Sequence, residues 1–127
     1  MAAEKTIVCI EDDPHIIDLI RLILQRKNFR LIGVTSSCDG LETIRKHRPD
    51  LVLLDLMMPE PDGWQILRTM ERDHELHTIP VIVVTVRSRC VDLLQDRHTP
   101  KVADYVTKPF GIQQLLDSVC GVLGVAV

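Results

Sequence analysis

Residues 51–59, LVLLDLMMP, decide the fold, because a short aliphatic run ends abruptly at the acid Asp55. Four consecutive aliphatic residues are too few for a helix and are typical of a strand buried on both faces. The Asp55 carboxylate therefore lies where a buried strand meets a loop, and it is the strongest candidate for a reactive group. Three other segments also end on polar groups: residues 7–10 on Glu11 and Asp12, residues 81–84 on Thr85, and residues 104–107 on Lys108.

Strand and helix patterns alternate along the chain, which predicts an α/β fold with a parallel sheet covered by helices on both faces. Asp13 and Pro14 favour a helix start, since aspartate accepts hydrogen bonds from free N–H groups and proline is tolerated in the first turn. The last expected helix places Ile112 on its apolar face, together with Leu115, Leu116 and Val119. The five expected helices run from Pro14 to about 27, and over residues 39–47, 64–72, 89–96 and 111–119.

Length and composition favour a single domain over residues 1–127, because 127 residues with 46% hydrophobic content suffice for one core. No apolar run approaches the about 18 residues that cross a bilayer, and none resembles a signal peptide, so we expect a cytoplasmic protein. The net charge of -3, with basic residues scattered, predicts no direct nucleic-acid binding. The four widely spaced cysteines are expected to be reduced and to bind no zinc.

The polar groups that end the strands should meet at one edge of the sheet, where open parallel sheets bind their ligands. Glu11, Asp12 and Asp55 would then repel one another unless a cation offsets their charge. Oxygen ligands without histidine or cysteine favour Mg²⁺ or Mn²⁺. A carboxylate can act as a nucleophile toward phosphorus when the charge on the oxygens of the transferred phosphoryl group is neutralised. Lys108 and Thr85 supply an ammonium and a hydroxyl for that task. The pattern therefore indicates phosphoryl chemistry.

Four pieces of the chain together resemble the receiver domain of two-component response regulators, the CheY-like superfamily: residues 10–13, 55–59 with 62–63, 84–85, and 105–110. The resemblance implies a flavodoxin-like, doubly wound, five-stranded parallel sheet of order 2-1-3-4-5 flanked by five helices. It also implies that Asp55 is a phosphoacceptor that takes a phosphoryl group from a phosphohistidine on a sensor histidine kinase or a histidine phosphotransfer protein. The domain would catalyse only its own phosphorylation and dephosphorylation, as a signalling domain rather than an enzyme.

The resemblance also implies roles for individual residues. Asp12 and Asp55 would bind the metal directly, Glu11 would act through water, and the main-chain carbonyl of Met57 would complete the protein ligands. A cis peptide bond would join Lys108 to Pro109. Thr85 and Tyr105 would form a switch pair that reshapes the surface of the fourth helix, fifth strand and last helix for an unknown downstream protein or a fused effector.

Two positions depart from the family pattern. Val86 stands where a small residue is usual, and we expect it to slow both phosphoryl transfer and hydrolysis. Lys101 and Val102 stand where Gly-Ala is usual in the family. The lost glycine affects the expected fourth helix and its loop, and with them any partner inferred by analogy.

The same residues bear on three functions other than that of a phosphorylated receiver. An aspartate-nucleophile phosphatase would need an acid where Met57 stands. A flavin protein would need a hydroxyl- and glycine-rich phosphate loop after the first strand. A receiver-like module that docks without phosphorylation stays open as the alternative.

Overall fold

The computed structural model describes residues 4–58, 63–86 and 102–126. Its centre is a five-stranded sheet in the order β2-β1-β3-β4-β5, in which all neighbouring strands are parallel. This confirms the predicted sheet order. The strands are β1 (Lys5–Ile10), β2 (Phe29–Val34), β3 (Leu51–Leu54), β4 (Val81–Val86) and β5 (Asp104–Lys108).

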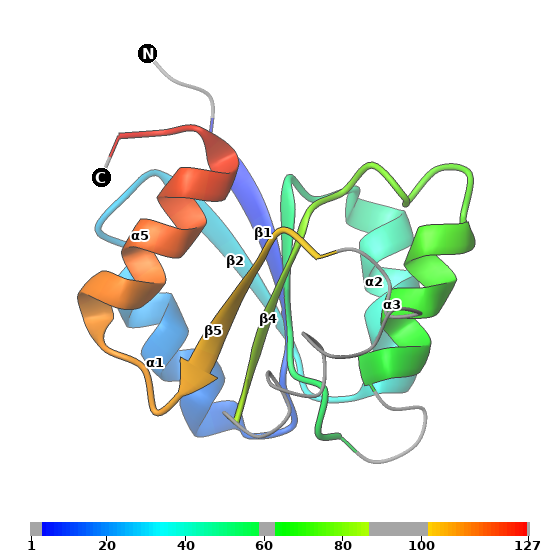
Figure 1. Ribbon diagram of the computed structural model, residues 1–127, viewed down its shortest axis with the longest axis horizontal. Helices are drawn as coiled ribbons and strands as arrows, with labels where there is room; N and C mark the ends of the chain where they lie inside the picture. Colours follow the sequence, from blue (N-terminus) through cyan, green and yellow to red (C-terminus); the bar gives the residue numbers. More distant parts are fainter. Residues whose placement is uncertain (1–3, 59–62, 87–101, 127) are drawn as a thin grey trace.

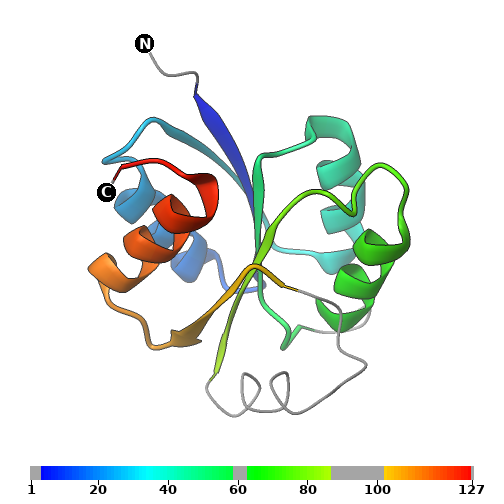
Figure 2. The same ribbon diagram turned by 45° about the horizontal axis from the view of Figure 1, so that its top comes forward.

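Helices cover both faces of this sheet, as Figures 1 and 2 show, with α1 and α5 on one face and α2 and α3 on the other. The helix expected over residues 89–96 falls outside the described residues. Within those residues, no helix has the length and apolar character needed to cross a membrane. The helices are α1 (Pro14–Leu24), α2 (Ser37–His47), α3 (Gly63–Arg72) and α5 (Ile112–Leu123).

The two layers of the core follow from the alternation of side chains along the central strands. In β1, Ile7 and Cys9 pack with α1 and α5, whereas Val8 and Ile10 pack with α2 and α3. Because successive side chains of a strand point to opposite faces, a strand buried on both faces must be apolar at every position. All four residues of β3 are buried, which explains why its sequence, LVLL, contains no polar residue.

The helix ends show where sequence patterns were accurate and where they were not. The Asp13 side chain accepts a hydrogen bond from the His15 backbone N–H at 2.9 Å, which confirms the predicted N-cap of α1. Helix α1 ends at Leu24, about one turn before the expected end. Helix α5 extends to Leu123 and is capped by Gly124, whose φ of 70° suits glycine. Ile112, which is expected on the apolar face of α5, is 45% exposed, whereas Leu115, Leu116 and Val119 are buried.

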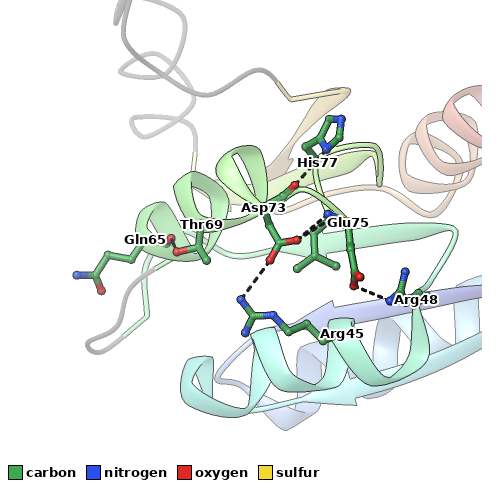
Figure 3. Close-up of polar contacts among 8 residues, drawn as sticks. Arg45, Arg48, Gln65, Thr69, Asp73, Glu75 and His77 are labelled. Carbon is green, nitrogen blue, oxygen red and sulfur yellow. Dashed lines mark hydrogen bonds and ion pairs between the residues drawn. The ribbon is translucent and has the colours of Figure 1, made fainter.

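The turn after α3 is tied to α2 by Asp73 (Figure 3). One carboxylate oxygen of Asp73 accepts hydrogen bonds from the backbone N–H groups of Glu75 and Leu76 at 2.8 and 3.1 Å, and the other lies 3.4 Å from the Arg45 guanidinium. The Glu75 N–H bond contributes most to lowering the pKa of Asp73, and the Leu76 N–H and Arg45 add to it. A second ion pair joins Arg48 to Glu75. These contacts join α2 and its C-cap residue to the turn after α3, at the end of the sheet remote from Asp55.

Candidate functional site

Three acids meet at the carboxyl ends of β1 and β3. These strands are neighbours, with Ile10 opposite Leu54, so the residues that follow them lie side by side. The Asp55 backbone N–H donates to the Ile10 carbonyl at 3.0 Å and continues the pairing by one residue. Carboxylate oxygens of Glu11, Asp12 and Asp55 lie within 4.8 Å of one another. The cluster predicted from the sequence is therefore present.

Lys108 reaches this cluster from the edge strand β5. Its Nζ lies 2.7 Å from Oε2 of Glu11 and 3.2 Å from Oδ2 of Asp55. The peptide bond to Pro109 is cis, as the resemblance implied. Three acidic side chains face one ammonium, so acidic groups outnumber basic ones and the site carries an excess of negative charge. An all-oxygen donor set of this charge fits a hard divalent cation.

Burial differs among the three acids and affects their protonation. Glu11 and Asp55 are 3% and 4% exposed, whereas Asp12 is exposed to solvent. Burial raises the pKa of Glu11 to about 7, and the negative charge of Asp55 adds to this shift while the Lys108 hydrogen bond opposes it. Burial lowers the pKa of Lys108, but Glu11 and Asp55 outweigh that effect and raise it. Lys108 therefore remains a cation beside both carboxylates.

The sequence did not indicate that Glu11 is the nearest partner of Lys108. The resemblance implied that Glu11 binds the metal through a water molecule. The ion pair between Glu11 and Lys108 is a contact beyond that role. Oδ1 of Asp55 accepts a hydrogen bond from the Met57 backbone N–H at 2.9 Å, so both oxygens of the candidate nucleophile have partners. The carboxylate is thus held in one orientation by the loop that follows it.

The two candidate switch residues lie on the same face of the sheet. Tyr105 is opposite Val83 in the strand register, and Thr85 is two residues beyond Val83, so both side chains point toward the α2 and α3 layer. The Thr85 hydroxyl is fully buried and has no hydrogen-bond partner among residues 4–58, 63–86 and 102–126. A buried hydroxyl at the end of β4 is therefore available to an incoming oxygen. Tyr105 is half-buried against the apolar core.

Gly63 also shapes the site, although the sequence analysis used it only as part of the family resemblance, just before the helix expected over residues 64–72. A Cβ at Gly63 would lie 2.7 Å from the Leu56 Cα and closer still to the Asp55 carbonyl oxygen. The first residue of α3 thus packs directly on the backbone of the candidate nucleophile. The helix begins one residue earlier than expected, at Gly63.

The residues that depart from the family pattern are placed as follows. Val86 is 37% exposed and lies opposite Lys108 in the β4–β5 register. Val102 is half-buried, and Lys101 falls outside the described part of the chain. Met57 has a 48% exposed thioether side chain, which cannot transfer protons, so the phosphatase interpretation gains no support.

Comparisons with known proteins agree with this geometry. The polar-differentiation response regulator DivK of Brucella anthropi is 30% identical over 120 residues, which cover 94% of this chain and 97% of that protein. The response regulator GtcR of Aneurinibacillus migulanus is 33% identical over 106 residues, 84% of this chain but 42% of that protein. The chain spans less than half the length of several relatives that it matches.

A solved structure confirms the fold. The receiver domain of a sensor histidine kinase from Pseudomonas aeruginosa PAO1, determined with a magnesium ion in its active-site cleft, superimposes with a TM-score of 0.82. The two are 24% identical, and the match covers 96% of this chain and 99% of that one. The family model of the response regulator receiver domain matches residues 7–120. The chain therefore belongs to the response regulator receiver domain family, whose members are signalling phosphoacceptors rather than classical enzymes.

Proposed function

We propose that Asp55 is the phosphoacceptor of this receiver domain and that it takes its phosphoryl group, in the cytoplasm, from a phosphohistidine of a sensor histidine kinase or a histidine phosphotransfer protein. The observation that carries the proposal is the Asp55 carboxylate, which is buried beside two other acids and 3.2 Å from the Lys108 ammonium. In the transfer, an Asp55 oxygen forms a bond to phosphorus while the phosphorus–nitrogen bond of the donor breaks. The imidazole nitrogen keeps that electron pair.

The residues around Asp55 suit the charges of this transfer. Asp12, Asp55 and the Met57 carbonyl would hold Mg²⁺ or Mn²⁺, with Glu11 acting through water, and the ion would neutralise one phosphoryl oxygen. The excess negative charge of the acid cluster supports this assignment, as does the magnesium ion in the Pseudomonas receiver. Lys108 would exchange its carboxylate partners for a second phosphoryl oxygen.

Thr85 and Tyr105 would convert this local event into a change of surface. The Thr85 hydroxyl, which has no partner in the described part of the chain, would donate a hydrogen bond to the third phosphoryl oxygen. Movement of Thr85 would leave space on its face of the sheet, into which the half-buried Tyr105 ring would turn. The altered surface around β5 and α5 would bind a downstream protein or a fused effector.

Mass spectrometry after incubation with Mg²⁺ and acetyl phosphate tests the phosphoacceptor. The wild-type chain should gain one phosphoryl group, and Asp55→Asn should gain none because an amide is not a nucleophile toward phosphorus. EDTA should prevent the gain. A module that docks without phosphorylation would show no adduct with saturating donor, and this result would overturn the proposal.

Two adjacent acids provide a matched test of the metal site. Asp12→Asn should weaken Mg²⁺ binding by at least roughly tenfold, because metal sites lose this much even when an outer partner is removed. Asp13→Asn should leave the affinity unchanged, since asparagine also caps helices and Asp13 already bonds the His15 N–H. Titration followed by the fluorescence of Trp64, which is adjacent to Gly63, measures both variants. Equal affinities would contradict the assignment of Asp12.

A further inference from the structure

Strand β2 forms one edge of the sheet, because it pairs with β1 alone, whereas β5 forms the other edge. Its register with β1 is unbroken from Phe29, opposite Lys5, to Val34, opposite Ile10. Edge strands usually carry charged side chains, a proline or a bulge, which prevent further pairing. The sequence of β2, FRLIGV, has one charged residue and neither a proline nor a bulge. No described strand pairs with its outer side, so this edge is open to another strand.

The backbone groups on the outer side of β2 belong to alternate residues. The carbonyls of Asn28 and Val34 accept hydrogen bonds from N–H groups of β1 and of the residue after it, at 3.2 and 3.0 Å. Successive residues of a strand present their N–H and C=O groups to opposite sides. Leu31 and Gly33 therefore direct their N–H and C=O groups away from β1, toward solvent.

Helix α2 runs along the same edge with its charges separated by sign. Its first turn holds the acid Asp39, and its last turn holds Arg45, Lys46 and His47. Asp39 and Lys46 are exposed, and both line a polar groove of about 450 Å³ between α2 and β2. Neither side chain forms an ion pair within the described part of the chain. Two copies of α2 placed antiparallel would set the acidic turn of each beside the basic turn of the other.

We propose that β2 pairs antiparallel with β2 of a second copy of this chain, across a two-fold axis, so that two domains share one continuous sheet. A two-fold interface requires a surface that complements itself. With the axis at Ile32, Leu31 of each copy lies opposite Gly33 of the other, and each such pair exchanges both N–H···O bonds. A large side chain then faces a small one, and on the other face of the sheet the two α2 helices match in charge.

This dimer leaves the functional parts of each copy accessible. Asp55 follows β3, which β1 separates from β2, and β5 lies at the opposite edge of the sheet. Pairing at β2 therefore needs neither phosphorylation nor movement of Thr85. The inference goes beyond the proposed function and does not depend on it. It adds an assembly that carries two signalling surfaces at the far edges of one sheet.

Amide hydrogen exchange, followed by NMR at increasing concentration of the full chain, tests the strand pairing. The N–H groups of Leu31 and Gly33 should exchange at least about tenfold more slowly in the dimer, because they gain acceptors there. Val106 is the matched control at the other edge of the sheet. The Ala103 N–H donates to the Val81 carbonyl at 2.8 Å, so by the same alternation the Val106 N–H points away from β4. Its exchange should not depend on concentration.

Charge reversal on α2 tests the arrangement of the two helices. Asp39→Lys and Lys46→Asp should each weaken the dimer about tenfold, because each change replaces two attractions across the axis with repulsions. The double variant should restore the affinity to within about threefold of the wild type. Glu71→Lys, on the exposed side of α3, makes the same change in net charge as Asp39→Lys and should leave the affinity unchanged. Sedimentation equilibrium measures the affinities, and circular dichroism monitors folding.

A dimer that protects Val106 rather than Leu31 and Gly33, or one that Asp39→Lys leaves equally tight, would overturn the proposed interface. A chain that stays monomeric at millimolar concentration would also overturn it, and would leave the β2 edge to a strand of another protein. Asp55→Asn should dimerise like the wild type, so loss of the phosphoacceptor and loss of the interface are distinguishable.

Discussion

Replacement of Gly63 by alanine gives a quantitative test of how closely α3 packs on the phosphoacceptor loop. The added Cβ would lie 2.7 Å from the Leu56 Cα, and nearer to the Asp55 carbonyl oxygen. These neighbours are main-chain atoms, which cannot rotate away as a side chain does. Overpacking costs about 1–3 kcal/mol, and alanine in place of a helical glycine returns about 0.5–1 kcal/mol. Because the clash is with main-chain atoms, the cost should lie at the upper end of its range, and we expect Gly63→Ala to lower the free energy of unfolding by about 2 kcal/mol.

Gly121→Ala provides the control. Gly121 also lies within a helix, α5, but a Cβ there would meet nothing within 4 Å. This variant should be about 0.5–1 kcal/mol more stable than the wild type, which isolates the conformational contribution of alanine. Urea unfolding followed by circular dichroism measures both variants. If Gly63→Ala is as stable as Gly121→Ala, the close packing of α3 on Asp55 is refuted.

Three further predictions concern Asp73, the cysteines and Val86. Asp73→Ala should lower the melting temperature at neutral pH; since the native pKa of Asp73 is lowered, this difference should be complete above about pH 4 and vanish as the pH falls through the native pKa. A melting-temperature difference that is the same above about pH 4 and below the native pKa of Asp73 would contradict this prediction. Iodoacetamide at about pH 8 should label exposed Cys38 but not buried Cys9. Burial, to which the nearby Glu11 charge adds, raises the pKa of Cys9 to about 12, so this thiol stays protonated. Peptide mass spectrometry measures the labelling, and modified Cys9 in the folded chain would contradict the prediction. Val86→Ala should accelerate both phosphorylation by acetyl phosphate and hydrolysis of the adduct, and unchanged rates would exclude a role for Val86 in access.

The sequence predicted the position of the acid cluster because that position depends on strand ends, and an acid directly after a buried apolar run marks such an end. Glu11 and Asp55 illustrate this, since each follows its strand by one residue. Contacts that depend on the relative placement of distant elements could not be predicted. The exposure of Ile112 depends on how α5 lies against the sheet, and helical periodicity gives only which residues share a face. The packing of Gly63 on Leu56 likewise requires the position of α3.

The buried hydroxyl of Thr85 has an energetic consequence for the proposed switch. Folding buries this donor without a partner in the described residues, and an unmade hydrogen bond of this kind costs roughly 1–3 kcal/mol. A conformation in which Thr85 gains an acceptor recovers that free energy. Because 1.4 kcal/mol corresponds to a factor of ten in population, one new oxygen atom can redistribute the conformers of the domain by about fivefold to a hundredfold. A single-atom contact at Thr85 would thus be worth a population shift of that size in the proposed switch.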